Sequence, residues 1–225
     1  MRRSHAIQEL MGMITGIHLD HPVRVGIDGV DCSGKTNLAN ELADSLKSTG
    51  RQVIRASIDG FHNPSSMRQK QGQYSPKGYY EDSFDLDSLL KCLLLPLGSN
   101  GSRLCQTSCF DFRVNRPTDS LKIRASATAI LVFEGVFLHK PELIEYWDFT
   151  IFMDSCFETT LRRALKRDLY LFSSEEEIQK RYCERYIPGQ RIYLELCNPA
   201  ERADVVFQND EIDSPSLIKR KVLKH

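Results

Sequence analysis

The sequence has no excess of either charge and no long apolar run. Its 225 residues include 30 Lys and Arg and 30 Asp and Glu, so the formal net charge at pH 7 is zero. A balanced chain has no overall positive field that would draw it to a nucleic acid or an anionic membrane. The apolar runs have the length of strands and never approach the ~20 residues that span a bilayer. We therefore expect neither nucleic acid nor membrane as a partner.

Paired metal ligands and a leader sequence are also missing. The seven cysteines are scattered and odd in number, which is typical of a protein from a reducing compartment. Only Cys105 and Cys109 are spaced at all like ligands, and no second Cys or His pair stands at zinc-site distance. Arg2 and Arg3 precede a fairly apolar stretch, but no small-residue cleavage site follows it. We expect a soluble, cytoplasmic protein without a zinc site.

No internal repeat or long linker divides the chain, so we expect one domain over residues 1–225. Strand-like apolar runs at 23–28, 53–58, 129–133, 149–153 and 205–207 alternate with helical patterns at 37–48, 86–95 and 157–171. Strands that alternate with helices favour a parallel sheet covered on both faces. The sequence therefore predicts a three-layer α/β fold with a mostly parallel five-stranded sheet and helices on both faces.

Three stretches stand apart from this alternation. Residues 1–22 begin with a helical pattern, and about 60–125 contain a predicted β-hairpin around Asn115. About 160–197 carry a basic helix followed by the capping-box start of another helix. We expect an N-terminal helix, an excursion that binds a second substrate, and a helical lid.

A phosphate-binding loop follows the first predicted strand. Its residues are Gly29, Val30, Asp31, Cys32, Ser33, Gly34, Lys35 and Thr36, which fit the Walker A pattern between a strand and a helix. Glycines let backbone amides face phosphates, the helix N-terminus adds positive charge, Lys35 supplies a cation to the β and γ phosphates, and Thr36 offers a hydroxyl to Mg²⁺. A glycine-rich turn with an exposed lysine is the alternative, which the strand and helix context disfavours. The pattern predicts a P-loop NTPase fold that binds ATP with Mg²⁺.

Two acids follow predicted strands, at the sheet edge where α/β proteins bind ligands. Glu134 stands where a Walker B carboxylate would hold Mg²⁺ through water, and Asp59 where it could accept a proton from an attacking hydroxyl. Either acid alone could be an ordinary turn residue.

Basic and aromatic residues extend this site. Arg163 and Arg167 are four apart on a predicted helix, so both could clamp one polyanion, although a solvated basic face has the same pattern. Residues His62, Tyr79, Tyr80 and Asn115 fall in the excursion and are candidates for contacts to an acceptor, with surface packing as the alternative.

Several short segments, taken in order, resemble the uridine kinase and phosphoribulokinase family of P-loop kinases, most closely its uridine kinase branch. They are Gly26-Ile27-Asp28-Gly29, Asp59-Gly60-Phe61-His62, Glu81-Asp82-Ser83-Phe84-Asp85, Phe110-Asp111-Phe112, Phe133-Glu134-Gly135, Arg162-Arg163 with Arg167-Asp168, Tyr186-Ile187-Pro188-Gly189 and Ala203-Asp204-Val205-Val206. Singly most of these segments are weak signals. Their shared order covers nearly the whole chain after residue 22.

The resemblance implies phosphoryl transfer from ATP to the 5′-hydroxyl of a nucleoside. It implies that Asp59 is the base, that Asp82 binds the ribose hydroxyls, and that the two lid arginines reach the phosphates. At the base site the sequence departs from the uridine kinase pattern, because His62 and Phe110 stand in place of tyrosines and Asn115 in place of a histidine.

The residues leave the acceptor open. A kinase of the same fold could act on another hydroxyl metabolite, such as pantothenate, a sugar phosphate or nicotinamide riboside. A regulatory ATPase, in which water is the acceptor, is a third reading. The related family often forms dimers or tetramers, so a homo-oligomer is compatible with the resemblance.

Overall fold

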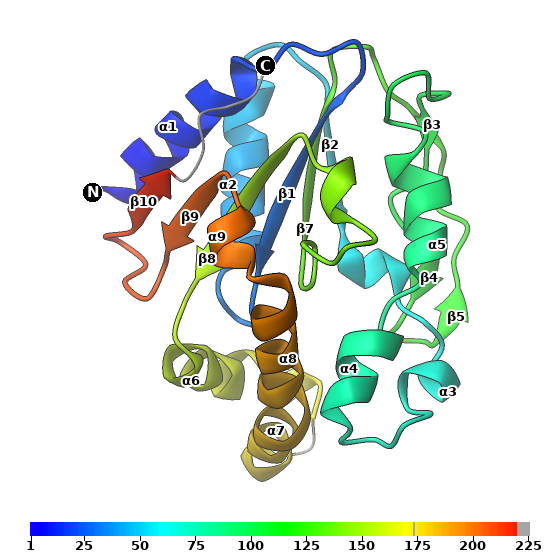
Figure 1. Cartoon of the computed structure of the whole chain (residues 1–225), viewed down its shortest axis with the longest axis vertical. Coiled ribbons are helices and arrows are strands. Elements are labelled where there is room, and N and C mark those ends of the chain that lie inside the picture. Colours follow the sequence, from blue (N-terminus) through cyan, green and yellow to red (C-terminus); the bar gives the residue numbers. More distant parts are fainter. Residues whose placement is uncertain (173, 220–225) are drawn as a thin grey trace.

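A twisted six-stranded sheet forms the centre of the protein (Figure 1). The computed structural model describes residues 1–172 and 174–219. The strands are β1 (Val23–Gly29), β2 (Val53–Ser57), β7 (Ile130–Gly135), β8 (Phe149–Asp154), β9 (Val205–Gln208) and β10 (Ser216–Lys219). Their order in the sheet is β10-β9-β8-β1-β7-β2. All neighbouring pairs from β2 to β9 are parallel, and β10 runs antiparallel to β9.

The predicted α/β fold with a mostly parallel sheet is confirmed, but the predicted count of five strands is wrong. The sixth strand, β10, has the sequence Ser-Leu-Ile-Lys and is only partly buried along its length. A short edge strand needs few apolar residues because just one side of it pairs. Its sequence therefore lacks the continuous apolar run that identified the other strands.

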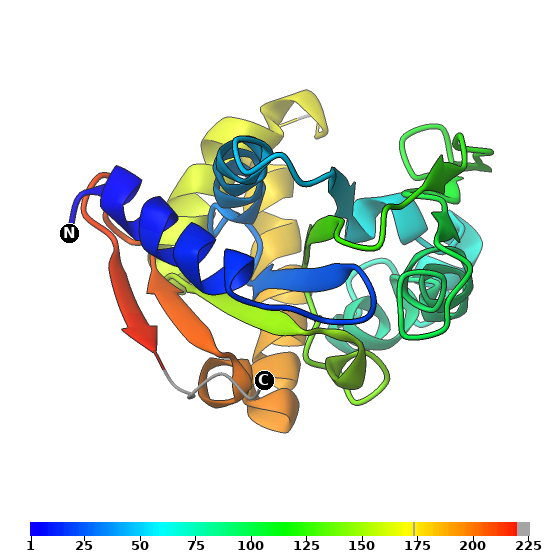
Figure 2. The same ribbon diagram turned by 90° about the horizontal axis from the view of Figure 1, so that it is seen from above.

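Helices cover both faces of the sheet, as Figure 2 shows from above. Side chains of β7 alternate between two apolar clusters, with Ile130 and Val132 on one face and Leu131 and Phe133 on the other. This is the two-residue period of a strand buried on both sides. The first face packs against α1 (Arg3–Thr15) and α2 (Lys35–Lys47). The second packs against α5 (Leu86–Leu89), η2 (Leu90–Leu94), and α8 (Ile187–Cys197) with α9 (Pro199–Arg202).

An excursion follows β2 and lies beside the sheet (Figure 1). It contains η1 (Ile58–Phe61), α3 (Ser65–Arg68), α4 (Pro76–Asp82), α5 and η2, and then four two-residue strands. Strand β3 (Leu104–Cys105) pairs with β6 (Ile123–Arg124), and β4 (Phe110–Asp111) pairs with β5 (Arg116–Pro117). The hairpin expected around Asn115 thus forms as two short antiparallel pairs, and Asn115 turns the chain with a φ of 53°.

The segment between β8 and β9 is helical. It contains α6 (Phe157–Arg167), η4 (Asp168–Tyr170), α7 (Glu175–Arg181) and η5 (Tyr182–Tyr186), and leads directly into α8. Ser174 caps α7, because its hydroxyl accepts a hydrogen bond from the Glu177 amide. After β7, the turn η3 (Ile144–Tyr146) leads to β8. Of the helices in the described ranges, none has the length and apolar character needed to cross a membrane.

Two glycine positions give a test of this packing. A Cβ at Gly26, in the central strand β1, would lie 2.9 Å from the ring of Trp147, and that ring is held by a 3.0 Å bond from its Nε1 to the Leu138 carbonyl. Gly26→Ala should therefore lower the free energy of unfolding by about 1–3 kcal/mol through overpacking.

The matched control is Gly12→Ala in helix α1, where an added Cβ would meet nothing within 4 Å. This change should raise stability by up to about 1 kcal/mol, because alanine favours a helix interior. Urea unfolding measures both. Equal midpoints for the two variants would contradict the tight packing of Trp147 against β1.

Candidate active site

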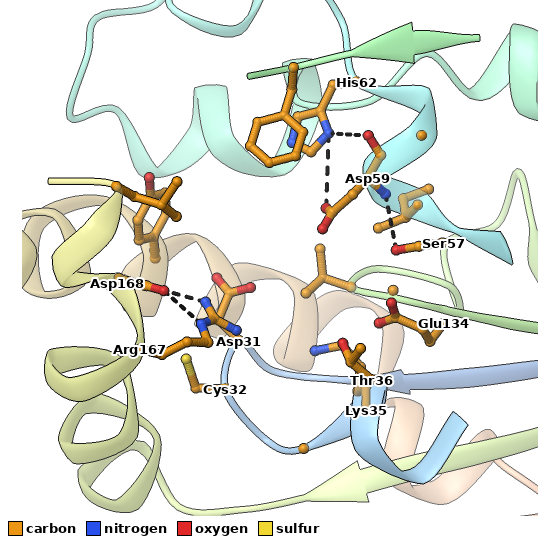
Figure 3. A pocket seen from close by; sticks show the side chains of 18 of the residues that line it. Asp31, Cys32, Lys35, Thr36, Ser57, Asp59, His62, Glu134, Arg167 and Asp168 are labelled. Atoms are coloured by element: carbon orange, nitrogen blue, oxygen red, sulfur yellow. Dashed lines mark hydrogen bonds and ion pairs between the residues drawn. The ribbon is translucent and has the colours of Figure 1, made fainter. Parts of the chain in front are cut away.

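A cavity of about 960 Å³ opens at the carboxyl ends of β1, β2 and β7 (Figure 3). Its wall comes from the P-loop, the ends of two further strands, the excursion and the helical segment after β8. The lining side chains named in the argument below are Asp31, Lys35, Thr36, Asp59, His62, Tyr79, Phe110, Glu134, Arg163, Arg167 and Tyr186. The parallel sheet thus brings together residues from the whole length of the chain.

The P-loop curves into a cradle, and its backbone at residues 29 and 34 has a conformation that favours glycine. Gly34 has a φ of 99°, and Gly29 has a φ of 152° with the Met153 carbonyl 2.7 Å from where a Cβ would stand. The Ser33 hydroxyl is buried and has no hydrogen-bond partner among the described residues. The Lys35 ammonium donates to the Val30 carbonyl at 2.7 Å, within the loop itself. Turned amides, an unpartnered hydroxyl and a cation at the start of α2 fit the phosphates of a nucleotide.

Side chains from distant elements hold this loop in place. Gln190 of α8 accepts a bond from the Asp31 amide at 2.7 Å and donates to the Asp31 carboxylate at 3.1 Å. The Tyr79 hydroxyl donates to the same carboxylate at 2.7 Å. On the other side, the Asn209 amide donates to the Ser33 carbonyl at 2.7 Å. Gln190 and Asn209 were not predicted as site residues, because no local pattern marks a glutamine or asparagine that holds a loop from afar.

The two acids predicted after strands both face the cavity (Figure 3). Glu134 has a side chain only 9% exposed, and the Arg55 guanidinium lies 3.6 Å from its carboxylate. Among the described residues, no group of three or more His, Cys, Asp or Glu side chains could hold a metal by itself. Thr36 and Glu134 line the same cavity, and a hydroxyl and a carboxylate fit a Mg²⁺ ion whose remaining ligands would come from phosphates and water, as the ion prefers.

Asp59 has an unusual environment for a carboxylate. The side chain lines the open cavity and is 61% exposed. Its enclosure by the cavity walls raises the pKa of Asp59 to about 6, and the negative charges of Glu134 and Asp31 add to the shift, while Lys35 and Arg167 oppose it. At pH 7 most of the carboxylate is ionised but basic enough to take a proton.

The two predicted lid arginines both line the cavity. Arg163 donates to the Asn209 carbonyl at 2.7 Å and to the Asp210 carbonyl at 3.0 Å. Arg167 forms a 2.6 Å bond with the Asp168 carboxylate, and 55% of its side chain is exposed. Backbone carbonyls therefore fix the Arg163 guanidinium and a carboxylate fixes that of Arg167. More than half of the Arg167 side chain stays exposed.

Of the six residues predicted to contact the acceptor, three line the cavity and three do not. His62, Tyr79 and Phe110 lie in the wall. The His62 ring stacks on Phe112 with centroids 4.8 Å apart and meets the edge of Phe84. Burial lowers the pKa of His62 to about 4, so the ring is neutral at pH 7. Its Nδ1 donates to the Asp59 carbonyl at 3.2 Å, which leaves Nε2 as an acceptor.

Tyr80, Asp82 and Asn115 are not among the residues that line this cavity. The Asp82 carboxylate binds Lys70 and Gln71, each at 2.7 Å. Tyr80 packs on Phe137, and Asn115 accepts a bond from the Ser65 amide at 2.8 Å. All three residues lie in the excursion between β2 and β7. The direction of each side chain, however, depends on partners that the sequence pattern does not show.

Comparison with known proteins identifies the family. The sequence model of the Phosphoribulokinase / Uridine kinase family matches residues 24–211. The chain belongs to this family. The expected resemblance is therefore confirmed over residues 24–211, which contain the P-loop and the segment after β8.

Individual members of the phosphoribulokinase and uridine kinase family agree with this assignment. The chain is 27% identical to uridine-cytidine kinase B of Dictyostelium discoideum over 68% of this chain and 60% of that protein. It is 24% identical to a uridine kinase of Limosilactobacillus reuteri over 82% of both chains. The solved structure of a possible uridine kinase from Bacillus stearothermophilus has a TM-score of 0.72 and 26% identity, covering 90% of this chain and 97% of that one. The chain thus spans less than two thirds of the D. discoideum relative.

Lys35→Ala tests the phosphate cradle. Loss of the ammonium should lower the rate of ATP turnover by at least about 10²–10³-fold, because one preorganised donor to a charged transition state is worth that much. The control is Lys47→Ala at the far end of α2, whose side chain is 63% exposed and pairs with Asp44. Steady-state ATP consumption measures both variants, and full activity of Lys35→Ala would contradict the assignment.

Proposed function

We propose that this protein is a kinase that transfers the γ-phosphoryl group of ATP to a small hydroxyl-bearing acceptor, with the 5′-hydroxyl of a nucleoside as the first candidate. The observation that carries the proposal is Asp59, a carboxylate with a raised pKa that shares one cavity with a P-loop. The names of the similar proteins support the nucleoside as acceptor. The two halves of the cavity match the two substrates of such a reaction.

The roles of the residues in the nucleotide half of the cavity follow from the P-loop geometry. The amides of residues 29–36 bind the phosphates, and Lys35 neutralises the charge that develops during transfer. Thr36 and Glu134 would hold Mg²⁺, which supplies charge neutralisation at the phosphates. Arg163 and Arg167 contribute positive charge from the opposite wall.

The chemistry in the acceptor half of the cavity follows from the position of Asp59. Its carboxylate takes the proton of the acceptor hydroxyl as that oxygen forms a bond to the γ phosphorus, and the bond from phosphorus to the ADP oxygen breaks. Protein packing sets the pKa of Asp59 close to neutral, so the group is both ionised and basic at the working pH. The products are ADP and the phosphorylated acceptor.

A second candidate acceptor is another small hydroxyl metabolite, such as pantothenate, a sugar phosphate or nicotinamide riboside. Among these, the Asp82 carboxylate favours an acceptor without a nucleoside ribose, because it is engaged by Lys70 and Gln71 rather than free to bind ribose hydroxyls. A regulatory ATPase is the less favoured reading, because the excursion builds a separate acceptor half around Asp59. ATP consumption with uridine, with the other acceptors and with no acceptor separates these three functions.

The helical segment of residues 160–197 is proposed as a lid that excludes water from the reaction. Addition of a non-hydrolysable ATP analogue with an acceptor should slow amide hydrogen exchange in α6, α7 and η5. Helix α1, on the far side of α2, serves as the internal control and should not change. Exchange in the 160–197 segment that is the same with and without ligands would contradict a lid.

Asp59→Asn tests the base. The variant should lose about 10²–10⁴-fold in turnover with little change in ATP affinity, because an amide cannot accept the proton. In the wild type, kcat/KM for the acceptor should fall as pH drops below about 6, since protonated Asp59 cannot act as a base. The pH dependence near 6 should be absent in the residual activity of Asp59→Asn. Full activity of this variant would exclude Asp59 as the base.

A further inference from the structure

A second, smaller cavity adjoins the acceptor half of the active site. It has a volume of about 90 Å³, and three of its lining residues, His62, Tyr79 and Tyr186, also line the large cavity. The remaining lining residues are Arg68, Gln69, Gln73, Ser83, Arg181 and Arg185. The small cavity is thus reached through the same aromatic residues that surround Asp59.

Its charge is strongly unbalanced. Three arginines line it, and only Arg181 has a carboxylate partner in the described ranges, Glu177 at 2.6 Å. Arg185 is 5% exposed and donates to neutral carbonyls, among them those of Arg68 at 2.9 Å and Gln73 at 3.0 Å. The nearby Asp82 carboxylate is already bound to Lys70. About two positive charges therefore stay without an anionic partner.

Arg68 carries a buried donor, its Nε, without a hydrogen-bond partner among the described residues. Burial lowers the pKa of the Arg68 guanidinium, and the neighbouring charge of Arg185 adds to this effect. A buried donor on a cation costs stability unless an anion or another acceptor satisfies it. Arg68 also lines the small cavity, so its guanidinium adds positive charge to a hollow that an anion would neutralise.

We propose that the Arg68 and Arg185 pocket binds an acidic group, a carboxylate or a phosphate, on the same acceptor molecule whose hydroxyl is phosphorylated at Asp59. This inference rests on the proposed phosphoryl transfer and favours an acidic metabolite, from the second group of candidate acceptors, over a neutral nucleoside. The volume of the pocket equals roughly three water molecules, which suits an acidic group and excludes a second nucleotide. His62 lies between the two sites, with its Nδ1 3.9 Å from the Asp59 carboxylate, so a small acceptor can reach both.

The experiment compares acids with their neutral counterparts as acceptors. Suitable pairs are D-glycerate with glycerol, pantothenate with pantothenol, and pentose phosphates with the free pentoses, beside uridine and cytidine. Each is assayed for phosphorylated product with wild type and with Arg68→Gln. We expect wild type to prefer one acid over its neutral partner. The carboxylate and phosphate arms of the panel tell which acidic group the pocket takes.

Arg68→Gln should raise KM for the acid by about 10- to 100-fold, the value of a charged hydrogen bond, with KM for ATP unchanged. It should also remove the preference for the acid over the neutral partner, which a purely structural role of Arg68 would not do. Arg68→Lys should retain part of the preference. Arg124→Gln, an exposed arginine in β6 away from both cavities, is the matched control and should behave as wild type.

Binding of a simple anion tests the pocket directly, without knowledge of which molecule is the acceptor. Sulfate is titrated calorimetrically into protein saturated with Mg²⁺ and a non-hydrolysable ATP analogue, so that the P-loop is filled. Wild type should bind sulfate at least about ten-fold more tightly than Arg68→Gln. Equal binding by both proteins would overturn the anion pocket.

The outcomes also separate this inference from the proposed function. Phosphorylation of neutral nucleosides, with Arg68→Gln as active as wild type, would overturn the acidic acceptor and leave the kinase intact. ATP hydrolysis that no acceptor stimulates, together with equal sulfate binding, would overturn both. Sulfate binding that depends on Arg68 without any acceptor phosphorylation would overturn the kinase and the acceptor role of the pocket.

Discussion

The site depends on the hydrogen bonds that fix the P-loop to the rest of the fold. Buried donors and acceptors in a low-dielectric interior hold a backbone far more rigidly than exposed ones. Beneath the loop, the fully buried Asp28 carboxylate accepts from the Gly29 amide at 2.7 Å and pairs with His139. Above it, Asp31 is bonded to Gln190 and Tyr79. Without these contacts a glycine-rich loop would lose its ordered arrangement of amides, so the phosphate cradle is a product of tertiary structure as much as of its own sequence.

The same contacts join the nucleotide half of the cavity to the acceptor half. Tyr79 binds the P-loop through its hydroxyl and lies in the wall of both cavities. Asp31, Asp59 and Glu134 line the large cavity together with the cations Lys35, Arg163 and Arg167, whereas Arg68 and Arg185 line the small cavity beyond His62. Acids and cations are thus mixed where a metal, phosphates and a proton are handled, and positive charge is in excess where an acidic acceptor would be held. An elongated acceptor with one acidic end would therefore be bound with that end in the small cavity.

The sequence predicts the parts of this arrangement that depend on local patterns. The P-loop at residues 29–36, the five parallel strands and the cap of α7 all carry their signal within a few residues. Strand β10 was missed because an edge strand needs little apolar sequence. The resemblance implies that Asp82 binds ribose hydroxyls, but the sequence does not show that Lys70 and Gln71 bind its carboxylate. The Arg68 and Arg185 pair was invisible, because the two residues are 117 positions apart and meet only when the helical segment packs on the excursion.

The position of these arginines would link acceptor binding to closure of the proposed lid. Arg181 and Arg185 belong to the segment of residues 160–197 that also carries Arg163 and Arg167. Arg185 ties this segment to the excursion through the carbonyls of residues 68–75. An acid bound between Arg68 and Arg185 would add a charged contact across the same junction, and ATP would add another at Arg163 and Arg167. Each substrate would then stabilise the segment at a different point, so the closed state is favoured most when both are present. Because water competes with any acceptor for the γ-phosphoryl group, this dependence on two ligands is a physical means of limiting hydrolysis.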